Sequence, residues 1–192
     1  MDVLIVVATE FEITSEKIKK NSVLVTGVGM VNVALNLTKE LMKRKYDLVI
    51  NMGIAGSFDN RLKNGDVVEV IEDCFCEIGF EDGDIFTEFT NFNLQTIYKV
   101  NPKTHLEGVS AITVNTVHGN EVSIKKIINR LNPKIESMEG ASVFKVCKEF
   151  NVSCLQIRSV SNKVERRNKE HWDLDAAIRS LNFEVEKVIN NI

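Results

Sequence analysis

Residues 3–8 read VLIVVA, a nearly unbroken apolar run that is typical of a strand buried on both faces of a sheet. Residues 22–29 (SVLVTGVG) and 47–58 (DLVINMGIAGSF) predict two more strands, each ending in a glycine-rich turn. Three further stretches carry the β-branched or alternating pattern of strands, at 65–76, 108–115 and 152–162. We therefore expect a sheet whose strands are spread along the whole chain.

Helical patterns lie between and after these strands. Residues 30–44 place apolar side chains at helical spacing and close with basic residues, which helix C-termini favour. Residues 121–131 predict a second helix, and 173–191 predict an amphipathic one. This alternation favours an α/β fold with a mostly parallel sheet flanked by helices. With 192 residues and no repeat or linker, we expect one domain spanning 1–192. Segment 77–95 is acidic and aromatic without a clear period, so no element is predicted there.

Composition narrows the classes of function. The chain is 44% hydrophobic, which is enough for a core, and its net charge of -3 with no basic stripe argues against nucleic-acid or membrane partners. The first apolar stretch is only about six residues long, too short for a signal peptide or membrane span, so we expect a cytoplasmic protein. The four cysteines lack CxxC spacing and are expected to be buried free thiols. No His, Cys and Asp cluster has metal-ligand spacing, so neither metal nor cofactor is expected.

Several polar or flexible positions follow predicted strands. In parallel α/β sheets, ligands bind beyond the carboxyl ends of the strands, so these positions are expected to converge on one crevice. They are Glu10 and Glu12, Gly27 and Gly29, the turn 53–56, the loop 115–119, Met138 with Glu139, and Ser161 with Asn162. Neither a Ser-His-Asp set nor a GxSxG elbow is present.

Each candidate also has a purely structural interpretation. The glycines after the second strand suit a tight turn, and Glu139 at a helix start is favoured by the helix dipole alone. Asn162 at a strand end suits a turn cap, and Glu12 suits a surface loop. The three histidines are scattered, and none is singled out as catalytic. Only the combination of these residues, in this order, points to a site.

Five stretches give the chain a recognisable likeness. They are VVATEFEI, TGVGMVNVA, DLVINMGIAGSF followed by LKNGDVVEV, IESMEGASVFKVCKEFNV, and LQIRSVSN. Together they resemble the nucleoside phosphorylase and nucleosidase superfamily over almost the whole chain. The resemblance implies a three-layer phosphorylase-like fold, with a central mixed, mostly parallel sheet flanked by helices. Within the superfamily, EDGDIF, TVNTVHGN and RSVSNKVERRNKEHWDLDAAI resemble the futalosine hydrolases of menaquinone biosynthesis, which release hypoxanthine and dehypoxanthine futalosine.

The resemblance also implies roles for individual residues. Glu139 accepts hydrogen bonds from the ribose hydroxyls and stabilises an oxocarbenium-like sugar, while Met138 provides an apolar floor. Glu12 corresponds to the acid that takes a proton from the attacking water. Asn162 is the third catalytic residue, because the leaving base needs protonation or strong hydrogen bonding at N7. The substrate-binding set is completed by Gly53, Ile54, Val117, Ser161 and Asn162.

Asn162 carries the prediction about the base. Superfamily members that act on 6-aminopurines have an aspartate at this position, whereas those that act on 6-oxopurines tend to have asparagine. The amide can donate to O6 or N7, whereas an amino group at C6 needs an acceptor. A buried mismatch costs roughly 1–3 kcal/mol, so Asn162 favours hypoxanthine over adenine. Val117 departs from the pattern, because nucleosidases of adenine compounds place an aromatic ring there.

Other functions stay open at this stage. Phosphorylases of the superfamily surround phosphate with arginines near the glycine loops, and those loops contain none here, which favours water. Arg61 and Arg158 keep phosphorolysis possible. Two further alternatives remain: a nucleosidase of methylthioadenosine, S-adenosylhomocysteine or aminofutalosine, and a non-catalytic nucleoside-binding protein.

The C5′ carboxyphenyl group of futalosine would need a cation and an aromatic wall. Lys163, Arg166 or Arg167 would supply the cation, and Phe80, Phe86 or Trp172 the wall. Members of the superfamily assemble as dimers or larger oligomers, so the resemblance implies a homodimer or larger homo-oligomer.

Overall fold

The computed structural model describes residues 1–89 and 91–192, and position 90 of the segment 77–95 lies outside the described residues. Its main sheet contains eight strands: β1 (Val3–Val7), β2 (Ser22–Val25), β3 (Leu48–Ser57), β4 (Val67–Phe75), β7 (Ile97–Lys99), β8 (Glu107–Thr113), β9 (Ile135–Ser137) and β10 (Ser153–Lys163). The helices are α1 (Met30–Lys43), α2 (Glu121–Leu131), α3 (Gly140–Glu149) and α4 (Leu174–Asn191), with short 3-10 turns at Glu10–Glu12, Ile18–Lys20 and Lys169–His171.

The sheet is mixed and mostly parallel. Strands β2, β1, β3 and β10 run parallel in that spatial order, and β4, β8 and β9 continue from β10, with β10–β4 antiparallel. Strand β9 then pairs back onto the end of β3, so β3, β10, β4, β8 and β9 close into a ring. The expected α/β fold is confirmed, and the closure curls the sheet around the ends of β3 and β10.

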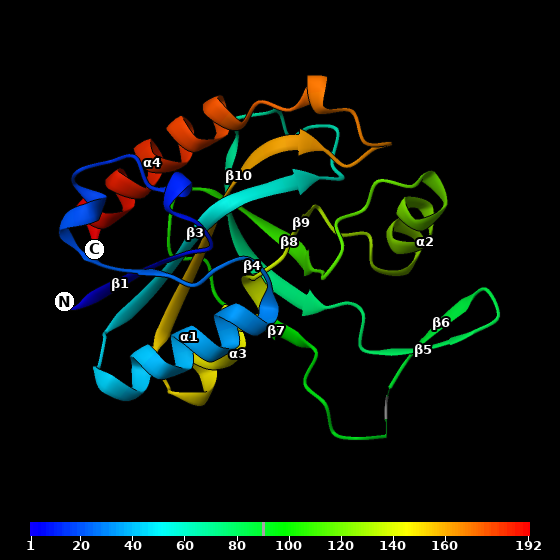
Figure 1. The fold of residues 1–192 in the computed structure, drawn as a ribbon, viewed down its shortest axis with the longest axis horizontal. Coiled ribbons are helices and arrows are strands. Elements are labelled where there is room, and N and C mark those ends of the chain that lie inside the picture. Colours follow the sequence, from blue (N-terminus) through cyan, green and yellow to red (C-terminus); the bar gives the residue numbers. More distant parts are fainter. Residues whose placement is uncertain (90) are drawn as a thin grey trace.

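Helices cover both faces of this sheet (Figure 1). Helices α1 and α3 pack side by side on one face, over a core that includes Val6, Leu37 and Phe144. Helix α4 lies on the other face, where Leu181 and Val185 pack against the apolar side chains of β1, β3 and β10. All four cysteines are buried and free. No described helix is long and apolar enough to cross a membrane.

Two expectations about local structure are wrong. The predicted glycine turn at 53–56 is part of β3, which continues to Ser57 because its glycines serve close packing and not chain reversal. Segment 77–95, predicted to have no regular element, contains a hairpin of β5 (Gly79–Asp82) and β6 (Ile85–Glu88). This hairpin projects from the body of the molecule (Figure 1).

One irregularity in β10 matters for the site. Strand β10 pairs in register with β3 from Ser153 to Val160, and a bulge then places Asn162 opposite Gly56. Such bulges redirect side chains at the ends of strands. Ser161 and Asn162 therefore leave the regular ladder at the point where β3 also meets β9.

Candidate active site

Glu12 is a carboxylate held almost entirely by backbone. It lies in the 3-10 turn after β1, and its Oε2 accepts hydrogen bonds from the N–H groups of Ala8 and Thr9, both at 2.9 Å. The Asn182 side chain of α4 donates to the Glu12 carbonyl at 3.0 Å, which ties the turn to the helix layer. Only 9% of Glu12 is exposed. A fixed, nearly dry carboxylate therefore follows the first strand, whereas Glu10 in the same turn points to solvent.

Glu139 is held from a distant part of the chain. Its Oε1 accepts a hydrogen bond at 2.9 Å from the N–H of Gly29, which precedes α1, and its Oε2 lies 3.2 Å from the N–H of Met138. The residue is half-buried at the start of α3, as is Met138. The glycine turn after the second strand therefore positions this acid.

The two acids lie close enough to influence each other. Burial raises the pKa of the Glu12 carboxyl above 4.5, and the negative charge of Glu139 raises it further. Hydrogen bonding by the Thr9 backbone and the positive charge of Arg158 oppose this shift, with a smaller contribution from the Ile54 backbone. The structure thus brings together the acids that follow the first strand and open α3.

Gly53 lies where the strand β3 approaches both Glu12 and Arg158. A Cβ atom on Gly53 would lie 2.8 Å from Oε1 of Glu12 and 2.9 Å from Nη1 of Arg158. Such distances are shorter than van der Waals contact, so a side chain here would displace one of these groups. Gly53 therefore creates the space in which the carboxylate and the guanidinium meet.

Arg158 is a cation that sequence reasoning considered only as a phosphate ligand. Only 1% of it is exposed, and its Nη2 donates to Oδ1 of Asn51 at 2.5 Å. Its Nε has no hydrogen-bond partner among the described residues. A buried cation needs a compensating charge, and the negative charge of Glu12 is nearby. Its place within an apolar strand gave no sequence signal of a role beside Glu12.

Asn162 has a defined amide orientation. Its Nδ2 donates to the carbonyl of Lys163 at 2.9 Å, and its Oδ1 accepts from Oγ of Ser161 at 2.8 Å. A flipped amide would place two oxygens against each other at Lys163, so this orientation is the favourable one. Because an NH₂ group has two hydrogens, Nδ2 keeps one for a ligand.

A narrow cleft borders Asn162. Its walls are formed by Gly56, Val117, His118, Glu136, Asn162, Lys163, Glu165, Arg167, Asn168 and Trp172. The Arg167 guanidinium stacks on the Trp172 ring, 4.8 Å from its centroid. Of the candidates for the C5′ group, Lys163, Arg167 and Trp172 line this cleft beside Asn162, whereas Phe80 and Phe86 lie in the hairpin. There the Arg130 guanidinium covers the Phe86 ring at 4.0 Å.

A second buried acid in this cleft escaped sequence reasoning. Glu136 of β9 is 3% exposed, and its two oxygens lie 3.0 Å from the backbone N–H and 2.6 Å from Nδ1 of His118. A glutamate inside a short buried strand was a signal that could have been noticed, because charged residues are rarely buried without a partner. Asn115 of the same loop turns away and bonds to Glu77.

A buried polar network fixes the start of α3. Thr113 accepts a hydrogen bond from the N–H of Ala141 at 2.8 Å and donates to Asp73 at 2.9 Å. The side-chain amide of Gln156 donates to the other oxygen of Asp73 at 2.8 Å. Burial raises the pKa of Asp73 from 3.8 to about 6, although both hydrogen bonds oppose that shift. A Cβ on Gly140 would collide with Asp73 and Gln156, so only glycine allows α3 to begin here.

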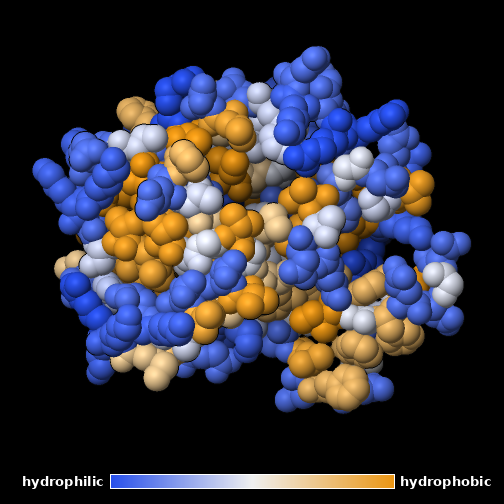
Figure 2. Space-filling view, in the orientation of Figure 1, coloured by the Kyte–Doolittle hydropathy of each residue, from blue (hydrophilic) through white to orange (hydrophobic). Residues whose placement is uncertain are grey.

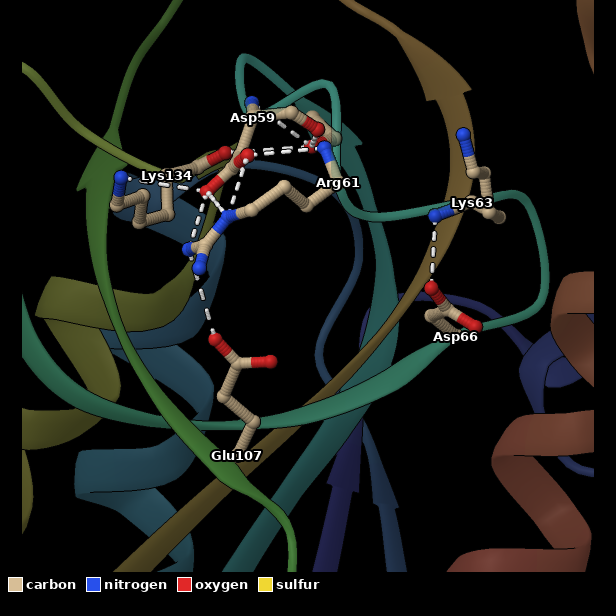
Figure 3. Close-up of polar contacts among 7 residues, drawn as sticks. Asp59, Arg61, Lys63, Asp66, Glu107 and Lys134 are labelled. Atoms are coloured by element: carbon tan, nitrogen blue, oxygen red, sulfur yellow. Dashed lines mark hydrogen bonds and ion pairs between the residues drawn. The ribbon is translucent and has the colours of Figure 1, made fainter.

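Arg61 is engaged by neighbouring charged side chains (Figure 3). Its guanidinium pairs with Asp59 at 2.8 Å and lies 3.8 Å from Glu107, while Lys134 approaches Asp59 at 3.2 Å. The hydrogen bonds from Arg61 lower the pKa of Asp59 well below its ordinary range. This cation is therefore part of a surface ion-pair network. Among residues 1–89 and 91–192, no His, Cys, Asp and Glu cluster could hold a metal ion.

Comparison with known proteins shows to which family the chain is related. The sequence model of the phosphorylase superfamily matches residues 5–190. A 5′-methylthioadenosine/S-adenosylhomocysteine nucleosidase of Buchnera aphidicola is 28% identical over 171 residues, covering 82% of this chain and 73% of that protein. A futalosine hydrolase of Streptomyces coelicolor is 27% identical over 180 residues, covering 86% and 77%.

Solved structures share the fold at lower identity. A futalosine hydrolase of Helicobacter pylori superposes with a TM-score of 0.85 at 17% identity, covering 99% of this chain and 97% of that one. A 5′-methylthioadenosine/S-adenosylhomocysteine nucleosidase of Neisseria meningitidis in complex with methylthio-immucillin-A gives 0.82 at 18% identity, with 99% of both chains covered.

Proposed function

Because this chain belongs to the phosphorylase superfamily, we propose that it is a nucleosidase that hydrolyses the N-glycosidic bond of futalosine. The products would be hypoxanthine and dehypoxanthine futalosine, as in the futalosine route to menaquinone. The observation that carries this proposal is the meeting of Glu12 and Glu139, two acids from distant parts of the chain. Futalosine hydrolases of three organisms are among the similar proteins.

The chemistry follows from these two acids. Glu12 takes a proton from water while the oxygen attacks C1′ of the sugar and the bond from C1′ to N9 breaks. The electron pair of that bond leaves with the base, which accepts a hydrogen bond from Asn162 and takes up a proton from solvent to give hypoxanthine. Its raised pKa suits a base that works near neutral pH, because a base is most effective when its pKa approaches the working pH. Glu139 holds the ribose hydroxyls and stabilises the positive charge that develops on the sugar. The positive charge of Arg158 favours the ionised form of the Glu12 carboxylate.

Asn162 supports a 6-oxopurine as the leaving base. Ser161 and Lys163 orient its amide so that Nδ2 retains a hydrogen for O6 or N7 of the base. A 6-aminopurine would present its own donor to this donor, which leaves two buried groups unpaired. Adenine nucleosides are therefore expected to be poorer substrates than futalosine.

Water is the favoured nucleophile over phosphate. A phosphate dianion needs fixed cations around it, and Arg61 is instead bound to Asp59 and Glu107. The Arg158 guanidinium is occupied by Asn51 and by the neighbouring charge of Glu12. The acids at this position would also repel a dianion. Turnover should therefore not depend on phosphate.

The second candidate is a nucleosidase of methylthioadenosine or S-adenosylhomocysteine. The similarity to the Buchnera aphidicola protein, at 28% identity, favours this alternative about as strongly as the futalosine hydrolases favour theirs. Both candidates use the same two acids and differ at the base and at C5′. A nucleoside-binding protein without catalysis would not need a buried carboxylate beside a sugar-binding acid.

We further propose that two copies associate through the apolar face of α1. Val31 is 77% exposed, and Leu35 and Met42 on the same helix are also exposed. An apolar groove between α1 and α3 continues this face and includes Met30, Phe75 and Phe150. Exposed apolar surface of this kind usually marks an interface. Val31→Asp is expected to yield monomers in sedimentation-velocity ultracentrifugation where the wild type forms dimers.

One experiment tests the main proposal. The purified chain is incubated with futalosine, its 6-amino analogue, inosine and methylthioadenosine, each with and without phosphate, and base release is followed by chromatography. We expect the fastest release from futalosine, with no phosphate requirement. Release of hypoxanthine from inosine only with phosphate, with futalosine left intact, would identify a phosphorylase and refute the proposal.

A further inference from the structure

Glu136 is a buried carboxylate that the proposed chemistry does not use. It lies in β9, between the Ile112 position of β8 and the Gly56 position of β3. Burying an ionised carboxylate is costly unless it is paired, and among the described residues only His118 hydrogen-bonds to the Glu136 side chain. Each carboxylate oxygen has one of these contacts, and a carboxylate can accept about four hydrogen bonds. Capacity for a ligand therefore remains.

Glu136 also lies beside Asn162. A Cβ placed on Gly56 would be 3.4 Å from Nδ2 of Asn162 and 3.6 Å from Cγ of Glu136, so both side chains border the same point of β3. Both contribute to the walls of the same cleft. The bulge in β10 brings Asn162 to this position, and the pairing of β9 with the end of β3 brings Glu136. A planar ligand in the cleft would thus meet an amide donor and a carboxylate acceptor.

A 6-oxopurine has the complementary pattern. Its O6 accepts hydrogen bonds, and the neighbouring N1 carries a hydrogen, whereas in a 6-aminopurine N1 has only a lone pair. We propose that Glu136 is a specificity-determining residue whose carboxylate accepts a hydrogen bond from N1–H of a 6-oxopurine base. This inference rests on the proposed nucleosidase function and extends it to the six-membered ring. A carboxylate facing the lone pair of adenine N1 would be repelled, because an ionised carboxylate cannot donate.

His118 acts here as a positioning residue. Its backbone N–H and Nδ1 hold the two oxygens of Glu136, and its ring packs edge-on against Phe58 at 6.0 Å between centroids. These contacts fix the carboxylate plane within the cleft. A purely structural role for the pair, as an anchor for the loop before α2, predicts that any substitution impairs all substrates equally.

The test compares two nucleosides that differ only at C6, futalosine and its 6-amino analogue. Glu136→Gln keeps the shape of the side chain and adds a donor that suits N1 of the 6-amino base. We expect the ratio of kcat/KM values, futalosine over the analogue, to fall by about 10-fold or more. His118→Asn is the matched control, because its amide nitrogen lies where Nδ1 lies and keeps the donor to Glu136. The control should leave the ratio unchanged.

The wild-type enzyme provides a second measurement that requires no variant to fold. As inhibitors of hydrolysis, hypoxanthine should bind about 10-fold or more tightly than 1-methylhypoxanthine, which lacks N1–H. Suppose that the wild type favours futalosine. If Glu136→Gln then has the same ratio of kcat/KM values, or if hypoxanthine and 1-methylhypoxanthine inhibit equally, the role of Glu136 is refuted and the proposed function stands. If the wild type hydrolyses neither nucleoside, or favours the 6-amino one, the proposed function falls with it.

Discussion

The two ends of the site are built in different ways. At the proposed sugar end, Glu12 and Glu139 accept hydrogen bonds from the backbone N–H groups of Ala8, Thr9 and Gly29, which any substitution except proline leaves in place. At the proposed base end, Asn162 and Glu136 each depend on one side-chain contact, from Ser161 Oγ and His118 Nδ1, in addition to one backbone contact. Backbone positioning suits chemistry that every substrate needs. Side-chain positioning suits recognition, because it can be changed one residue at a time.

The largest expected effect is at Glu12. Glu12→Gln should lower kcat for futalosine by about 10²–10⁴-fold, because the amide cannot take a proton from water. In the wild type, activity should fall as the pH drops through the raised pKa of Glu12, since only the ionised form is a base. Initial rates from pH 4 to 8, for the wild type and the variant, measure both effects. The residual activity of the variant should not show the loss at low pH that the wild type shows. An unchanged kcat would remove Glu12 from the chemistry.

Glu139→Gln tests the second acid at the sugar end. We expect kcat/KM to fall by about 10²–10³-fold, because the neutral amide no longer stabilises the positive sugar. The Gly29 contact can persist through the amide oxygen, so the far-ultraviolet circular dichroism spectrum should match that of the wild type. Met138→Leu is a matched control that keeps the apolar floor and the charge, and it should retain most activity. Wild-type turnover by Glu139→Gln would contradict the role.

Asp73→Asn tests how firmly the sugar end is fixed to the core. A pKa raised from 3.8 to about 6 stabilises the folded state by up to about 3 kcal/mol below pH 3.8, and this contribution is lost as the pH rises through 6. The free energy of unfolding of the wild type, relative to the variant, should therefore fall by up to that amount from pH 4 to pH 7. Urea unfolding at four pH values measures it. A constant difference would show that Asp73 does not titrate in this window.

Asn162→Asp addresses the base end and should have the smallest effect. The preference for futalosine over its 6-amino analogue, measured as the ratio of their kcat/KM values, should weaken by roughly 1–3 kcal/mol. The reason is that an acceptor replaces the donor that Lys163 and Ser161 orient. Steady-state kinetics on the two nucleosides measure the ratio. If both substrates lose activity equally, Asn162 contributes to the site without choosing the base.

The sequence predicted the sugar end better than the base end for a physical reason. Glu12 lies in the turn after the apolar strand β1, and Glu139 lies at the predicted helix start that became α3, so the order of elements along the chain was enough to single them out. The role of Arg158 could not be predicted in this way. Its neighbours Asn51 and Glu12 lie in other elements, and the sequence pattern of β10 indicates only a buried strand. Glu136 was missed because its neighbours in the cleft depend on the pairing of β9 with β3.

The hairpin β5–β6 was missed because its aromatic residues do not pack into the main core. Phe80 contacts Phe89, and the Phe86 ring lies against the Arg130 guanidinium. The sequence of the hairpin therefore lacks the alternation of buried apolar and exposed polar residues that predicts a strand. Apolar residues gather on this part of the surface, at the lower right of Figure 2. Strand β7 is three residues long, which is too short to give a recognisable strand pattern in the sequence.

Gly53 has a consequence for how this enzyme can be altered. Because its missing side chain leaves the room shared by Glu12 and Arg158, even one methyl group would displace one of these two side chains. A library randomised at position 53 should return glycine alone among active clones, whereas one randomised at position 117 should tolerate many residues, since Val117 lies at the exposed rim. New substrates would thus arise through changes at the rim and around Asn162, while position 53 stays glycine.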